Sequence, residues 1–307
     1  MAAAVAQNNA PVQKKQEAEK TESLWKDVWY SLRQNIPAMV SLGVITLLAL
    51  VAIVTFVAPQ ILPYDPYQQD LSASFQGPSA AHWFGTDQQG RDIFCRVLIG
   101  SQISLTVGLL SVAISLTIGV TLGALAGYKG GVLDTVIMRV MDVLLAVPSI
   151  LLSIALVSAM GTSVTNMMLA ISISNIPPFA RIVRSAVLTI KNEEYIEAAR
   201  AIGASDKRII LKHILPNCMA PIIVQATLSI AGSILAIASL SFIGLGISPP
   251  TPEWGSMVST GRQYFRAAWW VCAFPGFAIM LTILSLNLLG DGLRDALDPR
   301  YGGHRGK

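Results

Sequence analysis

The residues that could do catalytic or metal chemistry in this chain are few and widely separated. The three histidines, His82, His213 and His304, belong to different segments, and neither an H-x-x-x-H pair nor a carboxylate cluster accompanies them. A zinc site needs ligands at short spacing, and a hydrolase needs a nucleophile beside a base. No G-x-x-x-x-G-K-[ST] phosphate loop occurs either. The sequence therefore predicts no enzyme, no metal site and no cofactor bound by this chain.

Cysteine usage agrees with that prediction. Three cysteines lie in separate segments, without C-x-x-C or C-x-H spacing. An odd number so distributed argues against a disulfide framework. We interpret all three as packing residues: Cys95, Cys218 and Cys272.

The charged segment 192–217 stands out from the rest of the chain, because it lies between long apolar blocks. Asn192 can cap a first helix, and Gly203 can end it by adopting a left-handed backbone. Ser205 or Asp206 can cap a second helix, which we expect to stop near Pro216, where the next apolar block begins. Two interpretations are open at this point. The segment is either a basic loop on anionic lipid headgroups or an element that docks on another protein.

Composition places the chain in a membrane. Of its 307 residues, 53% are hydrophobic and 13% are charged, and the mean hydropathy is +0.56. A span of lipid needs about 20 apolar residues in a helix, because backbone groups in lipid must pair within the segment. The sequence predicts an all-α, polytopic integral membrane protein with about six transmembrane helices, near residues 39–58, 103–127, 136–160, 167–188, 219–243 and 271–290.

The distribution of lysine and arginine predicts the orientation of these spans. With the N-terminus in the cytoplasm, 18 of the 22 Lys and Arg residues fall on the cytoplasmic side. The positive-inside rule favours this arrangement, which leaves both termini and the segment 192–217 cytoplasmic. Only four basic residues remain outside: Arg91, Arg96, Arg262 and Arg266.

Two outer segments are long enough to have structure of their own. In the first, residues 59–101, the stretch 91–100 predicts a short amphipathic helix on the membrane surface. In the second, residues 244–270, the prolines and Gly255 of SPPTPEWG favour turns and exclude a regular helix.

Polar residues inside the predicted spans support several expectations. Arg139 and Asp142 are three residues apart and can pair on one helix face. Pro177 and Pro178 are expected to interrupt the fourth span. A translocation path needs weak hydrogen-bonding groups, although small residues at such spacing also make helix–helix contacts. The candidates for this path are Ser149, Ser153, Asn175, Gln225, Ser229 and Ser233.

The segment 192–217 resembles the EAA motif of the membrane subunits of bacterial ATP-binding cassette importers. The matching positions are Glu197, Ala198, Ala199, Gly203, Leu215 and Pro216. Where that motif has Ile three residues before the Pro, this chain has His213, followed by Ile214, as in the peptide-permease branch. Four further stretches agree with it: FGTDQQGRDIFCRVLIGSQISL (84–105), AGYKGG (126–131), PPTPEWG (249–255), and FPGFAI with NLLGDGLRDALDPR (274–300).

Together these stretches are similar to the C-type permease subunit of the dipeptide and oligopeptide importer family over residues 37–300. The resemblance implies a type I importer permease (MetI-like) fold in a bacterial inner membrane. It also implies that the EAA segment is a coupling helix seated on an ATPase. The expected partners are a second permease in a heterodimer, two ABC ATPases that carry ATP and Mg, an extracytoplasmic peptide-binding protein and membrane lipid, with no nucleic acid.

The expected organisation has three parts. Residues 1–36 form a cytoplasmic amphipathic tail, residues 37–300 the permease domain, and residues 301–307 a cytoplasmic C-terminal tail. The expected cargo is dipeptides or oligopeptides. Members of the same family that import glutathione or nickel are an alternative, and a passive channel or a membrane enzyme are rivals from other classes.

Overall fold

The structure is a computed structural model that describes residues 24–297. The start of the predicted N-terminal tail, residues 1–23, and the predicted tail 301–307 lie outside the described residues. In the described part the only β-structure is an isolated bridge between Thr86 and Asp92, so the all-α prediction is confirmed. The longer elements are α2 (Leu24–Gln34), α3 (Ile36–Val57), α4 (Ile93–Lys129), α5 (Gly131–Ala146), α6 (Ser149–Met160), α7 (Val164–Ile190), α8 (Glu194–Ala201), α10 (Met219–Phe242), α11 (Trp254–Gly261) and α12 (Trp270–Leu297).

Five of the predicted spans correspond to apolar helical segments. α3, α4, α12 and the run Asp206–Phe242 are each long and apolar enough to cross a membrane. α5 and α6 pass the same test only together, and they are bent by 89° at the break between them. The predicted continuous span 136–160 is therefore wrong, because the chain turns at Val147 and Pro148. α7 has the length, but polar residues along it keep it out of this set, so the count of six spans is approximate.

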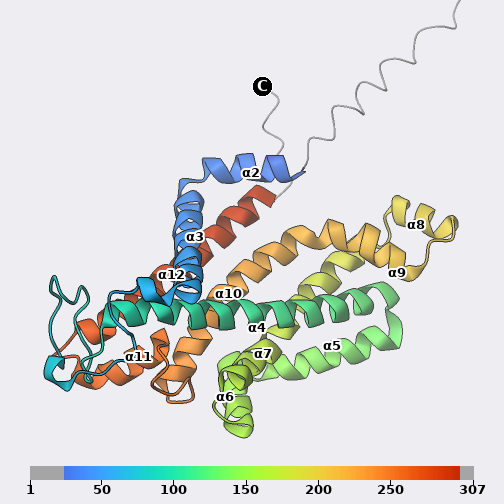
Figure 1. Cartoon of the computed structure of the whole chain (residues 1–307). Helices are drawn as coiled ribbons and strands as arrows, with labels where there is room; N and C mark the ends of the chain where they lie inside the picture. Colours follow the sequence, from blue (N-terminus) through green and yellow to red (C-terminus); the bar gives the residue numbers. More distant parts are fainter. Residues whose placement is uncertain (1–23, 298–307) are drawn as a thin grey trace, which may run out of the picture.

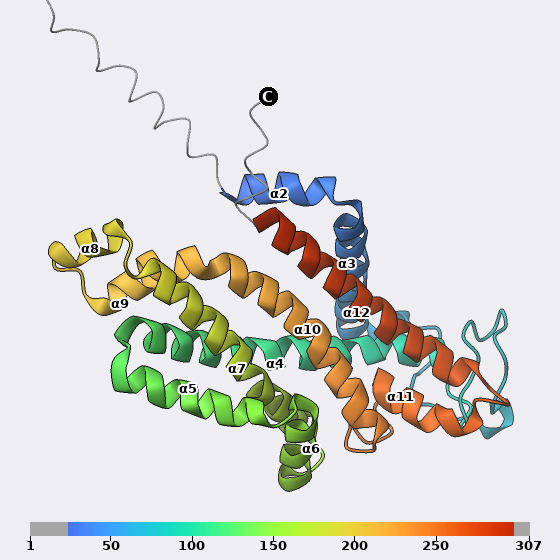
Figure 2. The same ribbon diagram turned by 180° about the vertical axis from the view of Figure 1, so that it is seen from behind.

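The molecule is elongated, with two distinct ends (Figure 1). The short helices α8 and α9 (Asp206–Ile209) project from one end, beside the ends of α4, α5 and α7. The loops of residues 59–92 gather with α11 at the opposite end, which we call the loop end (Figure 2). α2 lies across the start of α3 and contacts the end of α12.

The most extensive helix–helix contact in the described part of the chain joins α4 to α7, and it depends on glycine. Gly119, Gly123 and Gly127 recur every four residues along α4. They form a strip without side chains, the glycine strip, against which another helix can pack closely. A Cβ atom at Gly123 would lie 2.4 Å from the carbonyl oxygen of Ala180 on α7. The backbones of the two helices therefore touch along more than two turns.

This packing explains why the predicted interruption of the fourth span is wrong. α7 continues as a helix through Pro177 and Pro178, and Pro177 is buried. A proline removes one backbone hydrogen bond, but a helix within a bundle tolerates that loss when its neighbours hold it. Here Gly119 of α4 faces the backbone of Ile176 and the Cβ of Phe179 directly beside the two prolines.

The predicted pair between Arg139 and Asp142 is also wrong. Asp142 pairs instead with Arg181 of α7, at 2.7 Å, and Asp134 makes two hydrogen bonds to Arg184 at 2.5 and 2.6 Å. Both ion pairs join α5 to α7. The arginines of α7 thus neutralise the carboxylates of the neighbouring helix rather than reaching only for the membrane surface.

The predicted surface helix at 91–100 does not exist as a separate element. Asp92 caps α4 by accepting a hydrogen bond from the Cys95 amide at 2.8 Å, and the helix runs unbroken to Lys129. Its first turns are buried, because Arg96 donates to the carbonyl of Pro66 and lies 3.7 Å from the Asp87 carboxylate. This stretch is therefore the packed start of a transmembrane helix.

The loop end contains a helix where the sequence predicted turns only. α11 begins at Trp254, and the Glu253 carboxylate accepts hydrogen bonds at 2.7 Å from the amides of Gly255 and Ser256. Burial raises the pKa of the Glu253 carboxyl, against the effect of these two amides. Trp254 donates to the carbonyl of Val97 at 2.9 Å and so ties α11 to α4.

We predict that Gly123→Leu destabilises the chain, whereas Gly43→Leu does not. A side chain at position 123 would enter the backbone of α7, and overpacking of this kind costs about 1–3 kcal/mol. No atom lies within 4 Å of a Cβ at Gly43, on the exposed side of α3. Thermal unfolding of both variants in the same detergent measures the difference in stability. Equal unfolding midpoints would show that the glycine strip is not needed for the packing of α4 against α7.

Candidate functional site

The elbow, defined as residues 194–214, is the candidate functional site. It consists of α8, a turn at Gly203 with φ +82°, α9 and the π-helical turn that follows α9. The left-handed backbone at Gly203 favours glycine, as the sequence predicted. Ser205 caps α9 by accepting a hydrogen bond from the Arg208 amide at 3.4 Å, but the predicted cap at Asn192 is wrong because α8 begins after Glu193.

The second helix does not stop at Pro216 as expected. The chain passes from α9 into a π-helical turn, η3 (Ile210–Ile214), then a 3-10 turn, η4 (Leu215–Cys218), and on into α10. Pro216 has no N–H to donate to the carbonyl of Lys212, so the helix widens before it and tightens after it. The elbow is consequently joined to α10 by continuous helical backbone.

One side of the elbow is fixed to the bundle by apolar contacts. Ile196, Ile209 and Ile214 are fully buried, and Ala199 is nearly so. They belong to one cluster with residues at the ends of three long helices: Ala124, Tyr128, Val183, Val187, Cys218 and Ile222. These contacts join the elbow to α4, α7 and α10 at once.

Polar contacts tie the turn of the elbow to the end of α4. The Asp206 carboxylate accepts a hydrogen bond from the Tyr128 hydroxyl at 2.8 Å and pairs with Lys129 at 2.5 Å. The Arg200 guanidinium lies over the Tyr128 ring, 5.3 Å from its centre. Sequence reasoning missed this arrangement, because 78 residues separate Tyr128 from Asp206 and no local pattern joins them.

The other side of the elbow is exposed and carries several basic side chains. Ile202 is 86% exposed, the highest value among the large hydrophobic side chains of the described residues, and Tyr195 and Leu211 are also exposed. Seven charged residues of the same segment are exposed, and four of them are basic: Glu194, Glu197, Arg200, Asp206, Lys207, Arg208 and Lys212. An apolar knob within a charged rim is a surface suited to a protein partner.

The motif residues divide between these two sides. Ala199 faces the bundle, whereas Glu197, Ala198 and Gly203 are exposed. Of the two alanines, only Ala199 therefore permits close approach to the spans. Downstream, Leu215 is half-buried and Pro216 is exposed in the 3-10 turn.

The candidate path residues are scattered in this structure. Asn175 donates to the Ser233 hydroxyl at 3.0 Å, and Gln225 donates to Ser229 at 3.0 Å. Ser153 shares a hydrogen bond with Ser174, whereas Ser149 is exposed at the start of α6. The structure brings Asn175 and Ser233 together across α7 and α10, and it joins Ser153 of α6 to Ser174, the neighbour of Asn175 in α7.

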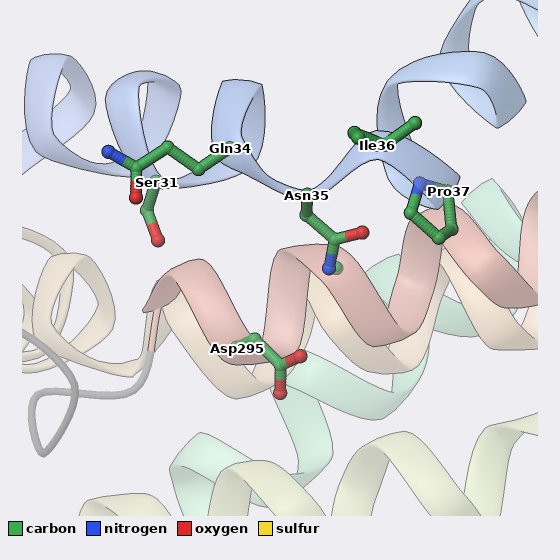
Figure 3. Close-up of a pocket in the computed structure, with 7 residues that line it drawn as sticks. Ser31, Gln34, Asn35, Ile36, Pro37 and Asp295 are labelled. Atoms are coloured by element: carbon green, nitrogen blue, oxygen red, sulfur yellow. The ribbon is translucent and has the colours of Figure 1, made fainter.

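A cavity of about 460 Å³ lies where α2 and α3 meet the end of α12. Figure 3 shows Asn35 pointing from the α2–α3 junction toward α12, which carries Asp295. Asn35 also caps α3 by accepting a hydrogen bond from the Ala38 amide at 3.1 Å. The cavity wall has neither histidine nor cysteine, and residues 24–297 contain no group of His, Cys, Asp and Glu that could hold a metal.

The comparisons with known proteins agree with this architecture. Residues 119–303 match the family described as binding-protein-dependent transport system inner membrane component. Residues 23–78 match the N-terminal transmembrane domain of oligopeptide transport permease C. The chain belongs to this family of importer permeases. Its members are the non-catalytic membrane subunits of ATP-binding cassette importers, as the sequence predicted.

Curated relatives match over nearly the whole chain. The dipeptide transport system permease protein DppC of Alkalihalophilus pseudofirmus is 49% identical over 91% of this chain and 90% of its own length. The probable D,D-dipeptide permease DdpC of Escherichia coli is 48% identical over 91% of this chain and 92% of its own. The glutathione permease GsiD of Pectobacterium atrosepticum is also 48% identical, over 90% of this chain and 91% of its own.

Solved structures support the fold. The MetNI methionine ABC transporter in an inward-facing conformation aligns with a TM-score of 0.53 at 21% identity. The alignment covers 66% of this chain and 96% of that one. A second crystal form of the same transporter gives a TM-score of 0.54 at 20% identity, with 67% of this chain and 98% of that chain covered. The predicted MetI-like permease fold is confirmed.

We predict that Ile196→Ala loosens the elbow, while Ile202→Ala leaves it unchanged. Ile196 is fully buried, and truncation of a buried isoleucine costs about 2–5 kcal/mol. Ile202 loses no contact within the chain because it is exposed. Hydrogen exchange of the backbone amides in residues 194–214 measures the effect, and equal exchange rates in the two variants would show that the cluster does not hold the elbow.

Proposed function

We propose that this chain is the permease subunit of an ATP-driven importer for short peptides, coupled through the elbow to a separate ATPase. The observation that carries the proposal is the division of the elbow into two sides. Ile196 and Ile209 attach the elbow to three long helices of the bundle, while the side chain of Ile202 is exposed on the other side of the elbow. A rigid element with one free apolar knob can receive motion from a partner and pass it to the spans.

The proposed mechanism is alternating access. When the ATPase subunits close on ATP, they would pull this elbow toward its counterpart on a second permease and open the path outward. Hydrolysis would then reset the pair. In this arrangement the elbow and both termini are cytoplasmic, as the distribution of Lys and Arg favours. The loop end faces an extracytoplasmic binding protein that delivers the cargo.

Short peptides are the cargo that the relatives' names favour. Relatives named for dipeptides and for glutathione are almost equally similar, at 49% and 48% identity, and glutathione is itself a small peptide. Import of nickel stays an alternative. A passive channel would need no partner at the elbow, and a membrane enzyme would need a nucleophile or metal site.

We predict that Ile202→Glu and Gly203→Val abolish ATP-dependent uptake without preventing folding. Glutamate would place a charge at the apolar knob, and valine would resist the φ of +82° at position 203. Ile61→Glu is the matched control, because Ile61 is 67% exposed near the loop end. Peptide uptake and ATPase copurification by the complete importer measure the result.

The outcomes separate the rival functions. Uptake that persists in both elbow variants would overturn the coupling role and favour a passive channel. Cargo is decided by expressing the wild-type importer in cells that lack other peptide importers and measuring entry of labelled Ala-Ala, glutathione and Ni²⁺. Uptake of Ni²⁺ with no uptake of either peptide would overturn the proposed cargo class.

A further inference from the structure

The sequence predicted that polar residues of α10, among them Ser229 and Ser233, line the path. The structure leaves a different face of α10 open. Ser229 and Ser233 point into the chain, where both are buried against neighbouring helices. The open face of α10 runs instead through Gly232, Leu235 and Phe242, all of which are exposed. No atom lies within 4 Å of a Cβ at Gly232. A path between two permease subunits can be lined only by a face that the chain leaves open.

This open face ends in a cavity at the loop end. The cavity has a volume of about 300 Å³, at the lower limit of ordinary ligand sites. Its walls come from three helices, and they include Ala238, Ser239 and Phe242 of α10, Ile243 directly after α10, Val258 of α11 and Ile279 of α12. The walls are mainly apolar, so they suit an uncharged side chain of a small ligand.

A cation lies against Phe242, one of the residues that line this cavity. The guanidinium carbon of Arg262 is 4.7 Å from the centre of the Phe242 ring. Arg262 is exposed, and among the described residues it has no carboxylate partner. The Phe242 ring holds the head of the side chain beside the cavity while its N–H groups remain available.

The four arginines of the predicted outer segments divide into two pairs. Arg91 and Arg96 are buried around the Asp87 carboxylate, at 2.7 and 3.7 Å, and so serve the packing of the loop end. Arg262 and Arg266 are exposed instead. Positive charge is disfavoured on the outer side of a membrane protein. An arginine that lies there beside a cavity, without a carboxylate partner, is therefore suited to bind an anion.

We propose that Arg262 and this cavity bind the C-terminal carboxylate and last side chain of a peptide at the outer mouth of the path. Arginine can hold a carboxylate through two parallel N–H···O bonds, which fixes its direction as well as its position. The apolar walls then receive the side chain next to that carboxylate. This inference rests on the proposed function, because it names the part of the cargo that the permease recognises.

A lipid phosphate is the competing anion. The cavity beside Phe242 favours a peptide, because its volume of about 300 Å³ suits one side chain of a small ligand better than the acyl chains of a lipid.

Binding to the complete importer in nanodiscs, without the binding protein, tests the inference. The probes are ¹³C-labelled Ala-Ala and its C-terminal amide, which differ only at the carboxylate. We expect wild type and Arg266→Gln to bind Ala-Ala at least about tenfold more tightly than the amide, as loss of one charged pair predicts. In Arg262→Gln this ratio falls to near one, and in Arg262→Lys it is intermediate.

The outcomes are distinct. An unchanged ratio in Arg262→Gln, or no binding of Ala-Ala to wild type, overturns the inference. Loss of bound phosphatidylglycerol from Arg262→Gln with the peptide ratio unchanged overturns it as well and assigns Arg262 to lipid. Failure of the proposed function appears separately, as absence of ATP-dependent Ala-Ala uptake by the wild-type importer with its binding protein.

Discussion

Close contact between α4 and α7 is the constraint on which the rest of the structure depends. A Cβ at Gly119 would lie 2.5 Å from the Cβ of Phe179, and one at Gly127 would lie 2.9 Å from the Cβ of Val187. Small residues let helix backbones approach in this way, and dispersion contacts then accumulate along the whole seam. The two helices therefore form one tightly packed unit.

This seam connects the two ends of the molecule. α4 has 37 residues and is about 55 Å long at 1.5 Å per residue. Near its start, the carbonyl of Val97 accepts the hydrogen bond from Trp254 of α11. At its other end, Tyr128 and Lys129 hold Asp206 of the elbow. One straight helix thus joins the surface proposed to meet an ATPase to the loop end proposed to receive the cargo.

The elbow also shows how a helix can turn without losing its connection to the bundle. Gly203 allows the sharp bend, and the π-helical and 3-10 turns around Pro216 carry the backbone onward into α10. Four buried aliphatic residues then prevent the bend from rotating freely. Flexible coupling would dissipate motion, whereas this element has fixed contacts on one side and a free surface on the other.

The sequence by itself determined the helical class, most of the spans, the bend at Gly203 and the family. These follow from local properties: apolar length, the conformational freedom of glycine and a motif of fixed spacing. Only the tertiary structure decided that α4 starts at Ile93, that α7 passes through its prolines, and that Asp142 pairs with Arg181. It also decided that Ser233 faces inward. Each of these depends on which neighbour lies against a helix, and that choice joins residues too far apart in the chain for any local pattern to record.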